Sequence, residues 1–184
     1  MTLAHRRKKN PDQVRLNIIE SAINLALGQG LPAISLETVA AAAGITKGGL
    51  FHHFPNKQVL IEQVYEHLLV EFTATIETSM ARDPDGYGRF TRAYIDLALA
   101  DDPADPGWAA LWASTITDKH LSRVWGQWLA GHLARHREAD DPRLQAARYA
   151  ADGVWAAVLC ETPPSDTEAL HRYLIGMTRR REDD

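Results

Sequence analysis

The sequence predicts an all-α protein of about nine helices, and two observations support this fold class. Apolar residues recur at intervals of three and four along nearly the whole chain, which is typical of helices with one buried face. No stretch of the sequence shows the alternation, bounded by turn residues, that indicates a half-buried strand. The chain has 184 residues, of which 45% are hydrophobic and 24% charged, so it can bury a core without disulfides or metals.

The first two helices are delimited by capping residues. The first is expected to begin at Pro11, because proline suits the first turn of a helix, and to stop at Gly30. The second is expected to follow Ser35, whose side chain is a good N-cap, and to end before Gly44.

A short third helix and a long fourth helix come next. Thr46 caps the third, and Pro55 ends it. Asn56 caps the fourth, which continues through Ile76 without a break. Beyond it we expect helices over approximately 89–100, 107–115, 118–138, 142–161 and 166–180.

Charge divides the chain into two parts. Residues 1–60 contain seven basic and three acidic side chains, a net charge of +4, whereas the other 124 residues contain 13 basic and 21 acidic ones, a net charge of −8. A basic part on an acidic body is expected when only the basic part meets a polyanion. We therefore predict an N-terminal domain over 1–56, joined by the continuous fourth helix to a helical domain over 57–184.

Residues 35–54, SLETVAAAAGITKGGLFHHF, predict a helix, a tight turn and a short helix. Gly44 supplies the backbone conformation of the turn, and Ile45 can pack with Val39 and Leu50. Such a helical corner also occurs in proteins that do not bind DNA.

The short third helix contains residues that an isolated helix disfavours. Lys47 and Lys57 each begin a helix, where a cation opposes the helix dipole, and Gly48 and Gly49 weaken the first turn of the third helix. A phosphate bound at each N-terminus would make both lysines favourable, and glycine would let the backbone approach DNA closely. Alternatively, these lysines are solvated surface residues and the glycines belong to a loop.

A basic N-terminal arm, with Arg6 and Arg7 in the run RRKK, precedes the first helix. Such an arm can enter a minor groove, although basic termini are often only solubilising. Together with the two lysines and the two glycines, it favours binding to double-stranded DNA.

The stretch from residue 14 to 64 resembles the DNA-binding region of the TetR family, most specifically in AGITKGGLFHHFPNKQVL. The resemblance implies base-edge contacts from Lys47, Gly48 and His52. It implies backbone contacts from Ser35, Thr46, Phe51, His53 and Lys57. The chain departs from the family in two places. Phe51 replaces a usual tyrosine, and Glu37 places an acid near the duplex, which would repel phosphate unless it points away or accepts from a cytosine amino group.

The same resemblance implies an effector cavity in the C-terminal domain. Five tryptophans are many for a body of this size, and Arg148 and Asp152 share a helix face with Trp155. Plain core packing, or an ordinary Arg148–Asp152 ion pair, is the alternative. The expected ligand-binding residues are Phe72, Ile76, Phe90, Tyr94, Trp108, Trp112, Trp128, Arg148, Asp152 and Trp155.

A homodimer is also expected, because one short recognition helix reads few bases, whereas two related by a two-fold axis read a palindromic operator with half-sites about 34–36 Å apart. The last two helices are the candidate interface, and internal packing is the alternative. The residues concerned are Ala146, Ala150, Gly153, Ala157, Leu170, Tyr173, Leu174 and Met177.

Other features favour a cytoplasmic, non-enzymatic protein. Cys160 is the only cysteine, and the sequence shows neither a signal peptide nor a membrane-spanning run. We expect no cofactor and no metal: His132 and His136 have the spacing of a zinc pair but lack a third ligand, and are expected on a solvated face.

The leading hypothesis is a repressor whose effector changes the spacing of two recognition helices. The alternatives are a constitutive DNA-binding regulator and a helical small-molecule-binding protein or enzyme. No catalytic constellation at convincing spacing supports the enzyme.

Overall fold

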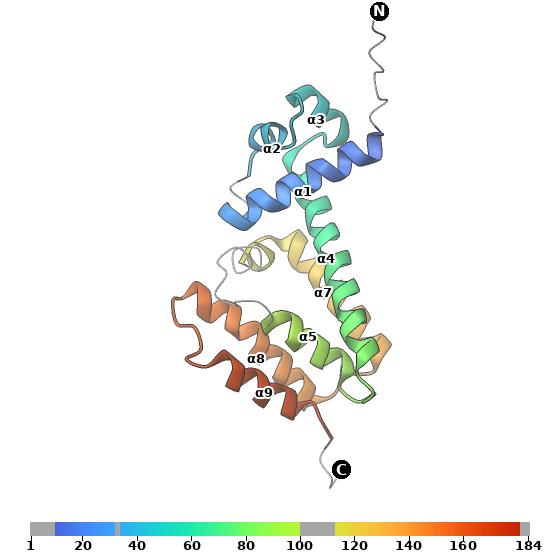
Figure 1. Ribbon diagram of the computed structural model, residues 1–184, viewed down its shortest axis with the longest axis vertical. Coiled ribbons are helices and arrows are strands. Elements are labelled where there is room, and N and C mark those ends of the chain that lie inside the picture. Colours follow the sequence, from blue (N-terminus) through green and yellow to red (C-terminus); the bar gives the residue numbers. More distant parts are fainter. Residues whose placement is uncertain (1–9, 32–33, 100–112, 181–184) are drawn as a thin grey trace, which may run out of the picture.

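The computed structural model describes residues 10–31, 34–99 and 113–180, and every regular element in these ranges is helical (Figure 1). The fold class predicted from the sequence is therefore confirmed. The predicted residues Arg6, Arg7, Trp108 and Trp112 lie outside the described residues, as does most of the helix expected at 107–115.

Three helices form the head of the molecule: α1 (Pro11–Gln29), α2 (Leu36–Ala42) and α3 (Lys47–His53). Local capping sets their starts, since the side chains of Asn10, Ser35 and Thr46 each accept a hydrogen bond from a backbone N–H of the first turn. Gly30 ends α1 with a φ of 77°, as the sequence predicts.

The 26-residue helix α4 (Lys57–Arg82) runs from the head into the body without interruption (Figure 1). Asn56 caps it by accepting from the backbone N–H of Val59. At 1.5 Å per residue, such a helix is about 39 Å long. The head is therefore attached to the body by a rigid element.

The body contains α5 (Arg89–Leu99), α7 (Lys119–His136), α8 (Pro142–Leu159) and α9 (Thr167–Met177), and residues 113–117 are also helical. Helix α5 occupies the middle of the body, because it contacts α4, α7, α8 and α9. Helices α8 and α9 lie side by side at the end of the molecule far from the head (Figure 1).

The core of the head continues into the body. Leu121 of α7 is buried in the same cluster as Leu50 of α3 and Leu68 of α4, and Trp125 and Trp128 pack against this cluster. Packing is thus continuous across residues 56 and 57. The predicted division into a DNA-binding domain over 1–56 and a helical domain over 57–184 therefore stays a proposal.

A buried carboxylate organises the body. Glu138 is 2% exposed and accepts hydrogen bonds from the backbone N–H groups of Phe90 and Thr91, each at 2.9 Å. These groups belong to the first turn of α5, whose N–H groups have no partner within the helix. Arg148 of α8 lies beside this carboxylate, with Nη1 3.9 Å from Oε2, and donates to the Thr91 hydroxyl. This network joins α5 to α8.

Among the described residues, no helix combines the length and the apolar character needed to cross a membrane.

Candidate nucleic-acid interface

The turn between α2 and α3 has the geometry that its sequence predicts. Gly44 has a φ of +65°, which lies in the left-handed region that glycine adopts without strain. Val39 and Leu50 are fully buried, and Ile45 packs against the same core. The turn thus fixes α3 against α2.

The two glycines of α3 differ in what the fold demands of them. A side chain at Gly49 would place its Cβ 3.3 Å from Thr46 Oγ1, the atom that accepts from the Gly49 N–H. A Cβ at Gly48 would meet nothing within 4 Å. No described part of the chain therefore requires glycine at position 48, although glycine weakens a helix by up to about 1 kcal/mol relative to alanine.

The outer surface of α3 carries most of the predicted contact residues. Lys47, Gly48, Phe51 and His52 are exposed and share one face by helical spacing. His53 is half-buried, and its carbonyl oxygen accepts from Arg15 Nη1 at 3.2 Å. The structure therefore brings four of the predicted residues to one surface and places His53 at its edge.

Ser35 and Lys57 lie at the starts of α2 and α4. The Ser35 hydroxyl accepts a hydrogen bond from the backbone N–H of Thr38 at 3.1 Å. In return, the backbone N–H of Ser35 donates to the Thr38 hydroxyl at 3.0 Å. Ser35 therefore completes a capping box. Lys57 is the first residue of α4 and is half-buried.

Glu37 has a partner that the sequence did not reveal. Its carboxylate forms an ion pair with the Lys47 ammonium group, across the turn between α2 and α3. The hydrogen bond from Lys47 is the main cause that lowers the pKa of the Glu37 carboxyl. The acid expected to repel phosphate is thus neutralised by the lysine expected to contact bases.

Comparison with known proteins identifies the family to which this chain belongs. The family model described as "Bacterial regulatory proteins, tetR family" matches residues 18–64, and the one described as "Tetracyclin repressor-like, C-terminal domain" matches residues 88–179. The chain belongs to the TetR family. It is accordingly a DNA-binding transcription regulator rather than an enzyme, as the sequence predicts.

Individual relatives agree. The chain is 28% identical over 177 residues to the HTH-type transcriptional regulator BetI of Burkholderia lata, covering 87% of this chain and 91% of the relative. It is 26% identical over 159 residues to BetI of Vibrio campbellii, covering 79% and 80%.

Solved structures show the same fold. A TetR-family member from Streptomyces coelicolor has a TM-score of 0.68 at 22% identity, covering 91% of this chain and 99% of that one. The multidrug binding protein EbrR complexed with malachite green has a TM-score of 0.69 at 22% identity, covering 90% and 98%.

In this TetR-family chain, several predicted effector-binding residues lie in a packed core. Ile76, Phe90 and Tyr94 form one buried cluster, and Trp128 packs against it while donating from Nε1 to Thr73 Oγ1 at 2.9 Å. Phe72 and Trp155 are half-buried. Trp125, which the sequence did not single out for this site, also packs here, with its ring centroid 6.3 Å from that of Tyr94.

The two polar residues expected in the effector site have separate partners. Tyr94 donates its hydroxyl to Asp152, and burial raises the pKa of Asp152. Arg148 is 3% exposed and donates to Thr91 and to the carbonyl oxygen of Glu138. Each of the two is thus engaged by another helix or loop, and the charge of Arg148 also acts to lower the pKa of Asp152, against the larger effect of burial.

The structure corrects the expectation for His132 and His136. Both rings stack on the buried Phe90, with centroid distances of 5.3 and 5.5 Å, and both residues are half-buried instead of lying on a solvated face. Burial is the first cause that lowers the pKa of each imidazole. No group of three side chains suited to a metal ion occurs within the described residues.

The predicted dimer residues fall into two groups. Ala146, Ala150 and Gly153 are exposed on α8, and Tyr173 is 69% exposed on α9. Ala157, Leu170 and Met177 are half-buried, and Leu174 is 1% exposed in a core cluster with Ala147, Ala151 and Val154. For Leu174 the structure therefore shows the alternative of internal packing.

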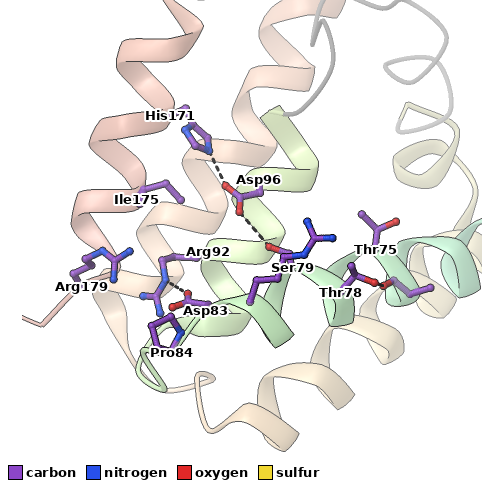
Figure 2. Close-up of a pocket in the computed structure, with 12 residues that line it drawn as sticks. Thr75, Thr78, Ser79, Asp83, Pro84, Arg92, Asp96, His171, Ile175 and Arg179 are labelled. Atoms are coloured by element: carbon purple, nitrogen blue, oxygen red, sulfur yellow. Dashed lines mark hydrogen bonds and ion pairs between the residues drawn. The ribbon is translucent and has the colours of Figure 1, made fainter.

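A groove of about 720 Å³ is lined by residues of α4, α5 and α9 (Figure 2). Asp96 lies between His171 and Ser79, with Oδ1 2.8 Å from His171 Nε2 and Oδ2 accepting from the Ser79 hydroxyl at 3.3 Å. Arg92 is buried at one end and donates from Nε to Asp83 at 2.5 Å. The described lining of this groove includes none of the residues that the sequence predicted for an effector.

Proposed function

We propose that this regulator is a repressor that binds a palindromic operator as a cytoplasmic homodimer and is released by a small molecule bound in its body. The exposed face of α3 carries the DNA-binding part of the proposal. It combines Lys47, Phe51 and His52 with Gly48, a glycine for which the described fold gives no internal reason.

Contact with the phosphate backbone of DNA would account for this combination of residues. The starts of α3 and α4 present backbone N–H groups, and these donors, together with the Lys57 ammonium group, favour an anion. A helix that lacks a side chain at residue 48 can bring its backbone close to the duplex. We propose that Ser35, Thr46, Gly49, Phe51 and His53 support this docking, and that Arg6 and Arg7 reach the minor groove.

The test is a mobility-shift titration of the protein on the DNA upstream of its own gene, repeated over a range of salt concentrations. Specific binding should weaken steeply with salt, and Lys57→Ala should reduce the slope of log affinity against log salt by about one unit. Lys119→Ala is the matched control, because Lys119 also begins a helix but lies on α7, in the body. Equal slopes for the wild type and Lys57→Ala would contradict the proposed contact.

The outer face of α8 and α9 supports the dimer. Ala146, Ala150 and Gly153 let another helix approach closely, and Tyr149 and Tyr173 add large apolar surface at 64% and 69% exposure. Tyr149 lies on the same side of α8 as the three small residues by its spacing, although the sequence analysis did not include it. Exposed apolar surface of this kind is typical of an interface.

The dimer can be tested by light scattering after size exclusion. Ala150→Arg places a long charged side chain in the proposed interface and should yield a monomer that loses operator binding. Ala134→Arg, on the exposed face of α7, is the control and should leave the dimer intact. A monomeric wild type would contradict the proposal.

For the effector, we propose a partly apolar or aromatic molecule bound among the aromatic residues of the body. The cluster of Phe90, Tyr94 and Trp128, with Trp125 beside it, supplies the apolar surface, and Asp152 a polar group. A screen of aromatic compounds by tryptophan fluorescence, followed by mobility shifts with each binder, tests this proposal. An effector weakens operator binding only to the extent that it binds the DNA-free conformation more tightly than the DNA-bound one.

One observation favours a second candidate, a regulator that binds DNA constitutively. Ile76 and Phe90 are fully buried, and Trp128 is held by a hydrogen bond to Thr73. Side chains fixed in this way leave less room for a ligand. If no compound shifts both fluorescence and DNA affinity, the constitutive function replaces the ligand-responsive one.

A further inference from the structure

The ion pair between Glu37 and Lys47 stands at the surface that the proposed function assigns to DNA. Glu37 lies in the first turn of α2 and Lys47 begins α3. The side chains keep 61% and 56% of their surface exposed, although they contact each other. Both charged groups are therefore accessible to a third partner.

The pair has a defined position. Lys47 Nζ lies 5.7 Å from the centre of the Phe51 ring, so one residue of α2 and another of α3 hold the ammonium group. The hydrogen bond from Lys47 lowers the pKa of Glu37, so the carboxylate is anionic at neutral pH. A donor and an acceptor of opposite charge are thus presented side by side.

We infer that Glu37 and Lys47 together select one G·C base pair in each half-site, with Lys47 donating to guanine and Glu37 accepting from the cytosine amino group. An ammonium group only donates and an ionised carboxylate only accepts. In the major groove, a G·C pair presents the guanine acceptors next to the cytosine N4 donor. The inference rests on the proposed function and names a base pair that it selects.

Glu37 also opposes DNA that lacks this base pair. Its carboxylate offsets the attraction of the Lys47 ammonium group for the phosphate backbone on any sequence, and a correctly placed amino group restores the binding energy that is lost. Removing Glu37 should therefore have opposite effects on two measurements. Affinity for arbitrary DNA should rise, and discrimination at one base pair should fall.

The experiment selects binding sites from a randomised duplex library with the wild type, Glu37→Ala and Glu20→Ala. Glu20→Ala is the matched control, because it removes the same charge from an exposed position on α1. Mobility shifts then compare the selected site with the same site carrying A·T for G·C at the affected position in both half-sites, at one salt concentration.

The wild type and Glu20→Ala should discriminate by about tenfold per half-site, whereas Glu37→Ala should bind both duplexes within about twofold. Lys47→Ala should lose preference at the same position. If Glu37→Ala keeps every base preference and only binds all DNA more tightly, Glu37 sets affinity alone and the inference is wrong. If the wild type selects no sequence at all, the proposed DNA-binding function itself fails, which is a distinguishable result.

Discussion

The hydroxyl of Tyr65 lies 2.9 Å from Thr115 Oγ1 and joins α4 to the helical residues 113–117. Both side chains are buried, at 6% and 7% exposure. Burial raises the pKa of Tyr65 to about 12, so the phenol is neutral at physiological pH. The contact ties the helix that bears the head to the segment that directly follows residues 100–112.

Replacing Tyr65 with phenylalanine removes this buried hydrogen bond and little else. We expect the free energy of unfolding to fall by about 1 kcal/mol, measured by urea denaturation. Thr75→Ala is the control, because it removes an exposed hydroxyl from the same helix and should change stability little. A Tyr65→Phe variant as stable as the wild type would show that the hydroxyl contributes nothing to this junction.

Gly48→Ala should separate stability from function. A Cβ there meets no atom within 4 Å, so alanine should stabilise α3 by up to about 1 kcal/mol while weakening operator binding by pushing the backbone away from the duplex. Thermal unfolding and mobility shifts measure the two effects. Gly126→Ala, in equally open space on α7, should stabilise without changing DNA affinity. Unchanged DNA affinity in Gly48→Ala would remove the argument for close approach.

Glu138→Ala should destabilise the body strongly. It leaves Arg148 buried without the carboxylate beside it, and it removes an acceptor from the first turn of α5. Breaking a buried pair in this way typically costs about 3–5 kcal/mol. Glu168→Ala is the control, because Glu168 is 81% exposed and pairs with Arg172 one turn away. Similar urea midpoints for the two variants would argue against the buried network.

Stability should fall as the pH drops below about 6.5, the ordinary pKa of histidine. Burial lowers the pKa of His132 and of His136 in the folded chain, so the unfolded chain takes up protons first. Their contribution is fully present above pH 6.5 and is lost as the pH falls through the lower folded values.

Urea denaturation at pH 7.5 and 5.5 measures this loss. His132→Phe should show a smaller loss, because it removes one of the two groups and also a buried Nδ1 atom that has no hydrogen-bond partner within the described structure. The same loss in His132→Phe and in the wild type would assign the pH dependence to other groups.

The sequence predicts local features of this chain well and tertiary ones poorly. Ser35, Thr46 and Asn56 cap helices through backbone groups three residues away, so their roles follow from short-range chemistry. Glu138 instead binds α5, 47 and 48 residues earlier in the chain. Nothing in the local sequence indicates that partner.

The candidate site shows the same division. Gly48 and Lys47 could be found from their conflict with helix formation, whereas the pairing of Glu37 with Lys47 depends on the angle between α2 and α3. The sequence predicts a solvated face for His132 and His136, whereas both rings stack on Phe90 of α5, which is distant in the sequence.

Because α4 is unbroken, its length sets both the rotation and the distance of the head relative to the body. One residue inserted between the head and the body would rotate the head by about 100° and move it by about 1.5 Å. In the proposed dimer both recognition helices would turn, and neither could face its groove. Seven inserted residues would nearly restore the angle but separate head from body by about 10 Å more. In the proposed dimer, the number of residues in α4 therefore helps to set the half-site spacing that the protein can bind.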